Sequence, residues 1–279
     1  MPSSTSTTSS IEDPVDTNGH GSSLDFTKMG FPSDYVDIII QAIDNPNNLT
    51  HEQLEELART VCAKAFEKSL YSYPLSSVLV TICDKDTNQV FTQSLINCCR
   101  EWYLDRSRLR PSDGHNTSPR KYRWAAYVAF LTDFYLNLKS KLRGVILKEN
   151  LDDEDESSHS EEDGQSDDDG PVPTLHTEFA DLLYDCGEDI VRGLDTTNSP
   201  TAEVECLLNI LRTVGKSLEK DRPERMNELI SQLKVTFIGP VSSRLSDMCV
   251  KSILQMIECA ASGWTFDQSQ ASYYYPSLS

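Results

Sequence analysis

The side chains in this sequence that could do chemistry are few and do not form a catalytic set. The five histidines are His20, His51, His115, His159 and His176. They fall in predicted tails, loops or helix starts, where histidines are usually solvated, and none is placed to act as a base for a buried cysteine. Phosphate-binding glycine loops, the nucleophile-elbow motif and the metalloprotease motif are also absent from the sequence. We therefore expect a protein that is not an enzyme.

The cysteines are predicted to be buried and reduced. They are Cys62, Cys83, Cys98, Cys99, Cys186, Cys206, Cys249 and Cys259. Most occupy apolar positions of helical patterns, where a free cysteine behaves as a small hydrophobic residue, and no pair has the C-x-x-C spacing of a zinc half-site. The longest apolar run, residues 124–131, is far too short to cross a bilayer. We expect no metal, no cofactor and no membrane contact, and a reducing compartment: the cytoplasm, with the nucleus as a second option.

A group of basic residues near the middle of the chain is a candidate RNA or partner face. Its members are Arg100, Arg106, Arg108, Arg110, Arg120, Lys121 and Arg123. The aromatic residues interleaved with them are Trp102, Tyr103, Tyr122 and Trp124. Such a mixture can hold phosphates and stack on bases. Two other interpretations stay open: a solvated helix end whose aromatic residues are in the core, or a dock for the acidic stretch of the same chain.

That acidic stretch carries most of the net charge of −19. It holds eleven carboxylates between Asp152 and Asp169 and no Lys or Arg, so the rest of the chain carries only −8. A block of like charge resists collapse, which predicts a disordered acidic linker over 150–173. An acidic residue follows three positions after each of Ser158, Ser160 and Ser166, a pattern that favours phosphorylation by acidophilic kinases. An acidic chaperone for basic proteins such as histones is an alternative function.

The remaining sequence has helical periodicity almost throughout and no alternation of period two. Helices are predicted over 33–44, from about 50, over about 75–83, from 86 or 87 to 104, over 120–142, 175–194, from 200, over 224–237 and over 242–261. Residues 120–142 are apolar nearly all round, which indicates a central helix. About nine helices in antiparallel pairs predict an all-α, HEAT-type α-solenoid over 26–265, interrupted by the acidic linker. Residues 1–25 are predicted to be a disordered Ser/Thr-rich tail, and 266–279 an aromatic C-terminal tail.

Aromatic residues near the end of the chain are candidate interface anchors. They are Trp264, Phe266, Tyr273, Tyr274 and Tyr275. Such residues often dominate the energetics of protein interfaces. The alternative is that they pack back on the last predicted helix.

Several segments resemble one family. The run from Val204 to Lys220 (VECLLNILRTVGKSLEK) resembles the leucine-rich helix, glycine and Leu-Glu signature of the middle domain of translation initiation factor four gamma. Arg225–Ile230 (RMNELI) and Ala261–Trp264 (ASGW) extend the resemblance, which covers about 31–275 without the acidic stretch. It implies a HEAT-type array without catalysis. The implied partners are translation initiation factors, an RNA helicase, and a histone stem-loop-binding or poly(A)-binding protein.

These observations lead us to expect a non-enzymatic adaptor that links an mRNA-bound protein to the initiation machinery. Direct RNA binding through the basic stretch at 100–123 is the alternative. Since the resemblance includes short members that self-associate, a homodimer is a further option.

Overall fold

The chain folds as a stack of helices. The computed structural model describes residues 25–109, 123–152, 174–197 and 200–275, and within these ranges it contains no strand. Ten α-helices are present: α1 (Ser33–Asp44), α2 (His51–Ala65), α3 (Ser72–Lys85), α4 (Val90–Leu104), α5 (Arg123–Asp152), α6 (Leu175–Gly193), α7 (Pro200–Asp221), α8 (Pro223–Ile238), α9 (Asp247–Ala261) and α10 (Gln268–Tyr274). The prediction of an all-α fold is confirmed.

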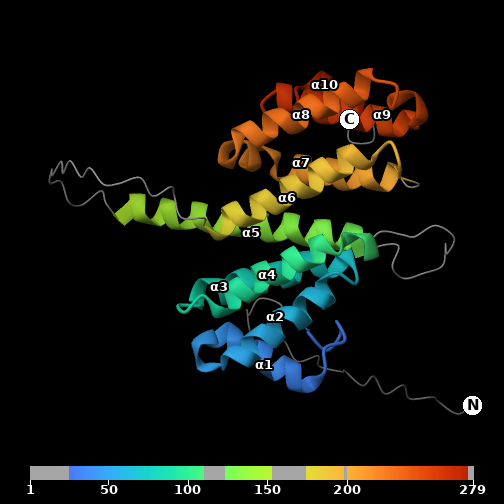
Figure 1. Cartoon of the computed structure of the whole chain (residues 1–279). Coiled ribbons are helices and arrows are strands. Elements are labelled where there is room, and N and C mark those ends of the chain that lie inside the picture. Colours follow the sequence, from blue (N-terminus) through green and yellow to red (C-terminus); the bar gives the residue numbers. More distant parts are fainter. Residues whose placement is uncertain (1–24, 110–122, 153–173, 198–199, 276–279) are drawn as a thin grey trace, which may run out of the picture.

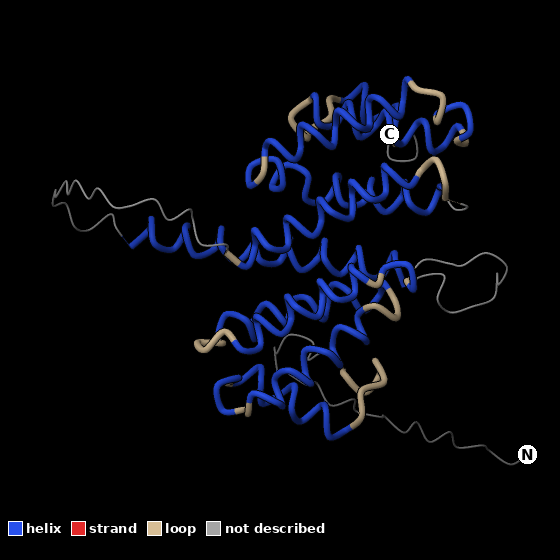
Figure 2. The backbone as a smooth tube through the Cα atoms, in the orientation of Figure 1, coloured by secondary structure: helices blue, strands red, loops and turns tan. Residues whose placement is uncertain are grey.

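The helices are stacked in two layers, as in a solenoid. The odd-numbered helices α1 to α9 contact one another in chain order, and so do the even-numbered helices α2 to α8. Each odd helix is thus followed by an even partner, and the pairs succeed one another along the molecule from α1 to α10 (Figure 1; the same trace is shown as a tube in Figure 2). This arrangement confirms the predicted HEAT-type array. No helix within the described residues is long and apolar enough to cross a membrane.

The central position predicted for residues 120–142 is confirmed by α5, which lies in the middle of the stack (Figure 1). Its Tyr127, Phe130 and Phe134 are fully buried. Phe130 meets Phe66 at the end of α2 edge-on, with ring centroids 5.4 Å apart, and Phe134 lies 4.3 Å from the ring of Phe179 on α6. Aromatic contacts of this geometry add to the free energy gained by burial. One row of rings therefore joins both halves of the solenoid through α5.

Local capping sets where several helices begin. Thr50 and Gln53 form a capping box at the start of α2. The last long helix was predicted from residue 242 but begins at Asp247, because the Ser246 side chain accepts a hydrogen bond from the Cys249 N–H and residues 242–244 form a separate 3₁₀ turn. Met248, in the first turn of α9, is 67% exposed.

The residues of the C-terminal signature meet in space. The indole of Trp264 lies directly on Gly215 of α7, where a Cβ would come within 2.2 Å of the ring. The indole N–H donates to Glu219 at 2.7 Å. The glycine and the tryptophan of the signature are thus the two sides of one close contact. The short helix α10 follows it, within the segment that was predicted as a tail.

Candidate partner-binding surface

Four of the basic residues predicted as a functional face belong to the described part of the chain. They lie at the C-terminal end of α4, in the 3₁₀ turn that follows it (Arg106–Arg108), and at the start of α5. The start of α4 is fixed by Asp86, whose buried carboxylate accepts a hydrogen bond from the Thr92 N–H at 2.8 Å. The end of α4 packs beside α6, which supplies a row of acidic residues. The basic face is therefore built against an acidic helix.

Two of the predicted basic residues are engaged by that helix. Arg100 forms an ion pair with Glu178. Arg106 binds Asp189 with two donors, Nε to Oδ2 at 2.8 Å and Nη2 to Oδ1 at 3.1 Å. A guanidinium held by two parallel bonds is strongly fixed in orientation, and the bond to Asp189 raises the pKa of Arg106 further above its ordinary value. The Arg106 guanidinium thus mainly holds the end of α4 against α6, and is not a free cation.

Tyr103 adds a further contact between α4 and α6. Its ring lies under the Arg106 guanidinium, 4.5 Å from ring centroid to Cζ, and its hydroxyl donates to the backbone oxygen of Asp185 at 3.1 Å. Burial, together with the negative charge of Asp189, raises the pKa of Tyr103 to about 12. The phenol therefore stays protonated at neutral pH and keeps donating to α6.

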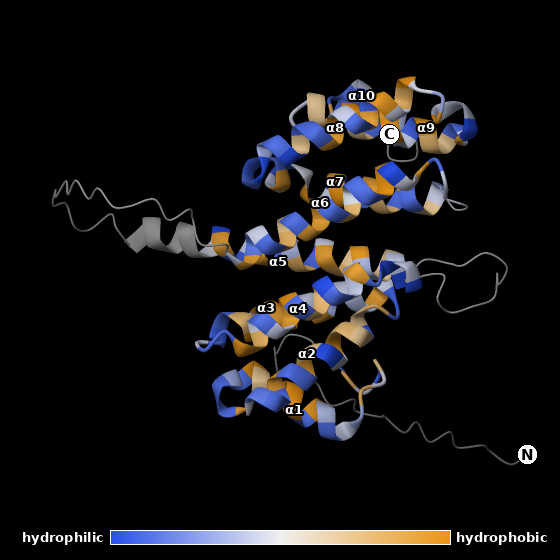
Figure 3. Cartoon of the chain, in the orientation of Figure 1, coloured by the Kyte–Doolittle hydropathy of each residue, from blue (hydrophilic) through white to orange (hydrophobic). Residues whose placement is uncertain are grey.

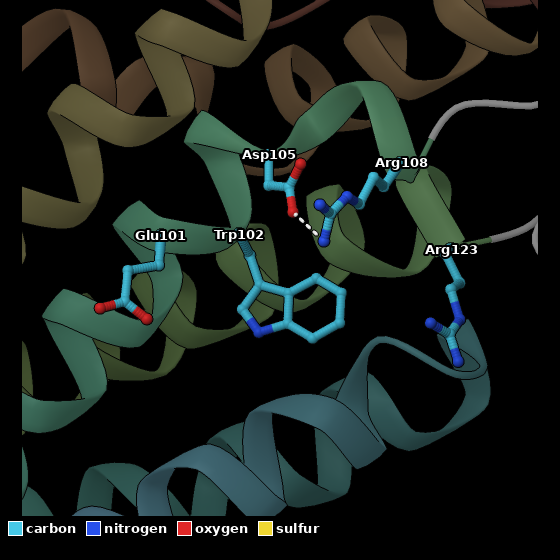
Figure 4. Close-up of a pocket in the computed structure, with 5 residues that line it drawn as sticks. All are labelled: Glu101, Trp102, Asp105, Arg108 and Arg123. Carbon is cyan, nitrogen blue, oxygen red and sulfur yellow. Dashed lines mark ion pairs between the residues drawn. The ribbon is translucent and has the colours of Figure 1, made fainter.

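A pocket of about 420 Å³ opens on the other side of α4, toward α2. Its walls are Glu101, Trp102, Asp105, Arg108 and Arg123 (Figure 4). The Trp102 indole points toward the end of α2, where it meets Phe66 edge-on at 5.2 Å. Asp105 and Arg108 form an exposed ion pair at 3.0 Å, whereas Glu101 and Arg123 form no ion pair with any described residue. A flat ring beside carboxylates and guanidinium groups suits a polar ligand with a flat group.

The two interleaved tryptophans divide between the core and this pocket. Trp124 is buried and donates to the Glu203 carboxylate at 2.8 Å, and it stacks on Tyr127. Trp102 is half-buried and is the only one of the two tryptophans that lines the pocket. The reading of these aromatic residues as core thus applies to Trp124, while Trp102 remains accessible.

Several predicted site residues lie outside the described residues. They are Arg110, Arg120, Lys121, Ser158, Ser160 and Ser166. Among the described basic residues, Arg108 and Arg123 are the two that border the pocket. The acidic partners Glu178 and Asp189 were missed by the sequence analysis, because residues about eighty positions apart share no periodic signal.

The C-terminal aromatic residues mostly pack on α7 and α9. Tyr274 donates to Glu258 at 2.8 Å and stacks on Phe266, and the Tyr275 hydroxyl accepts from Gln255 at 2.6 Å beneath Arg212. Tyr273 differs from its neighbours, since it is 58% exposed and is covered on one face by Lys251. Of this group, Tyr273 offers the most surface to a partner.

Groups that could support catalysis or metal binding do not converge in the described part of the chain. No set of three or more His, Cys, Asp or Glu side chains there could hold a metal ion. Seven of the cysteines are buried and all eight are free thiols, and burial raises the pKa of Cys83 to about 12. The pKa of His176 is lowered, mainly by burial. A buried, protonated thiol such as that of Cys83 is a poor nucleophile.

Comparison with known proteins gives one consistent result. The model of the family described as MIF4G domain matches residues 23–249. The chain is 25% identical over 259 residues to MIF4G domain-containing protein B of Xenopus laevis, which covers 91% of this chain and 96% of that protein. It is 22% identical over 265 residues to MIF4G domain-containing protein of Homo sapiens, covering 94% and 99%. A shorter match of 97 residues to MIF4G domain-containing protein A of Danio rerio reaches 35% identity, over 35% of this chain and 43% of that protein.

Proposed function

The chain belongs to the MIF4G domain family, and from this premise we propose that it is a non-enzymatic adaptor in mRNA translation. MIF4G domains are helical scaffolds that mediate protein interactions in the translation machinery. In this proposal, the solenoid links a protein bound to the mRNA, of histone stem-loop-binding or poly(A)-binding type, to initiation factors and an RNA helicase. The work takes place in the cytoplasm, with the nucleus as a second site.

The observation that carries the proposal is the extent of the family match. It spans α1 to α8 and reaches into α9, so it includes both layers of the stack and the α4–α6 ties. The described residues add surfaces that suit partner binding: the pocket around Trp102, and nine large hydrophobic side chains left exposed. Exposed apolar residues and a half-buried tryptophan are frequent anchors of protein interfaces.

Affinity purification of the full chain, with and without RNase, tests the adaptor role. We expect initiation factors, a helicase and an mRNA-bound protein to be recovered, and to remain after RNase because the contacts are between proteins. Recovery that disappears entirely with RNase, or that contains no initiation factor, would contradict the proposal. Sedimentation of the purified chain determines whether it acts as a monomer or as a homodimer.

Direct RNA binding is a second candidate, favoured by the pocket in Figure 4. There Trp102 could stack on a base while Arg108 and Arg123 hold its phosphate. The ion pairs of Arg100 and Arg106 with α6 weigh against a long phosphate track.

Charge reversal separates the two candidates. If RNA binds here, Arg108→Glu with Arg123→Glu should strongly weaken the RNA affinity and flatten the fall of the remaining affinity between about 50 and 200 mM salt. Arg192→Glu, at a similarly exposed position on α6, is the matched control. If partner proteins are still recovered with the double variant, and if the unmodified chain has no measurable RNA affinity, only the adaptor role remains supported.

A further inference from the structure

A second opening lies at the N-terminal end of the solenoid, remote in the sequence from the Trp102 pocket. This terminal groove, of about 610 Å³, is formed by α1, α3 and the turn before α1. Its apolar lining comes from Phe26, Val36, Ile40, Ile43 and Val78. Phe26 belongs to the core, whereas Ile40 is 54% exposed. Figure 3 colours the middle of α1 as hydrophobic, and among the described residues no helix precedes α1 to cover this face.

Ile40 stands at a boundary between apolar and acidic surface. Residues three and four positions apart are neighbours on a helix, so Val36 and Ile43 border Ile40 on the side of the groove and Asp37 and Asp44 border it on the other. Both aspartates are exposed, and neither forms an ion pair with a described residue. The groove thus has an apolar floor. Its rim carries the carboxylates of Asp37 and Asp44 beside Ile40, and the Asp25–Lys28 ion pair in the turn before α1.

Two lysines near this rim, Lys28 and Lys85, are bound to other groups of the chain. Lys28 pairs with Asp25 at 3.0 Å. Lys85 donates to the backbone oxygens of Ile43 at 2.6 Å and of Asp44 at 3.1 Å, and so caps the C-terminal end of α1. Helix α1 itself contains three aspartates and no Lys or Arg. The negative charge beside Ile40 is therefore left for an external partner to neutralise.

We propose that the terminal groove docks an amphipathic helix of a partner protein, with bulky apolar side chains in the groove and Lys or Arg residues against Asp37 and Asp44. Apolar side chains at helical spacing would match the apolar floor. The basic flank would fix the orientation and exclude acidic segments, which the rim repels. This docking rests on the groove itself, whatever process the partner belongs to.

A synthetic probe tests the proposal in the full chain. It is a Leu/Lys peptide of about 18 residues, long enough to form a helix, with Leu at helical spacing. We expect saturable shifts of the Ile40 and Ile43 methyl signals in NMR spectra. Ile40→Ser should weaken binding at least about tenfold by removing apolar contact, and Asp37→Lys with Asp44→Lys should do so by reversing the charge beside Ile40. Because these side chains are exposed, the fold should survive.

Three controls make the result specific. A scrambled peptide of equal composition tests for simple attraction to the acidic stretch, a Leu/Glu peptide tests the charge requirement, and Leu104→Ser removes an exposed leucine elsewhere. Equal shifts of the Ile40 methyl with the scrambled or Leu/Glu peptide would overturn the proposal, and so would unchanged affinity in Ile40→Ser. It would also be overturned by a dimer that Ile40→Ser dissociates, since the occupant would then be a second copy. The adaptor role could stand in each of these cases.

Discussion

At the scale of single residues, the contact between Gly215 and Trp264 makes a direct prediction. Gly215→Ala places a Cβ 2.2 Å from the indole, so we expect the free energy of unfolding to fall by about 1 to 3 kcal/mol. Gly144→Ala in α5 is the matched control, because nothing lies within 4 Å of its added Cβ. That substitution should raise stability by up to about 1 kcal/mol through helix propensity. Chemical denaturation measures both, and equal effects would contradict the contact.

Asp133 of α5 gives a prediction that depends on pH. It accepts a hydrogen bond from Ser72, but burial raises the pKa of its carboxyl above the ordinary value. A raised pKa in the folded state means that this group's contribution to stability is full below the unfolded pKa, about 4, and is lost as pH rises through the folded pKa. Asp133→Asn keeps an acceptor for Ser72 and cannot ionise.

We therefore expect Asp133→Asn to gain stability relative to the unmodified chain as pH rises from about 4 to about 7. Urea denaturation at both pH values measures this difference, with the exposed Asp34→Asn as the control substitution. A difference that is constant with pH, or that shrinks toward neutral pH, would show that burial does not penalise this carboxylate.

Residue-level roles could be predicted only where local pattern determines them. The capping box of Thr50 and the burial of Leu207 and Leu211 follow from neighbours within one helix. The roles of Arg100 and Arg106 depend on Glu178 and Asp189, on a helix that only the folded stack brings close. A cluster of basic residues in the sequence therefore indicated a face for RNA or a partner, whereas two of its members tie α4 to α6.

At the scale of elements, α5 holds the two halves of the solenoid together. Its Phe134 packs between Phe130 and Phe179, and Lys139 and Tyr135 both bind the buried Asp221 of α7. The all-round apolar character of residues 120–142 predicted this central position correctly. The end of α5 was harder to predict, since the helix continues through Gly144 to Asp152 and contains no proline.

Phe134→Ala tests whether α5 couples the halves. We expect a loss of about 3 to 5 kcal/mol, typical of a buried phenylalanine, and faster amide hydrogen exchange in both α3 and α6, which contact α5 on its two sides. Leu104→Ala, at a position 76% exposed, should change neither quantity appreciably. Faster exchange confined to one side of α5 would mean that the halves are stabilised independently.

At the scale of the whole molecule, the stacked helices and the match to the MIF4G domain family make a scaffold the best-supported function. Hydrophobic periodicity alone predicted the all-α solenoid, because each helix buries one face on its neighbours in chain order. The short α10 was not predicted, since its seven residues contain only Ala and Tyr as apolar side chains and depend on the Asp267 capping box and on packing against α9. Which surfaces remain exposed after stacking could not be predicted from periodicity, and the terminal groove is one of them.

The central claim, an adaptor that promotes translation, is tested most directly by tethering. The full chain is fused to an unrelated RNA-binding domain, recruited to a reporter mRNA carrying its site, and protein output is measured per reporter mRNA. The account predicts that output rises above that of the RNA-binding domain alone, and that the destabilised Phe134→Ala fusion loses the increase. Unchanged output from a folded, recruited fusion, at equal mRNA level, would contradict the account.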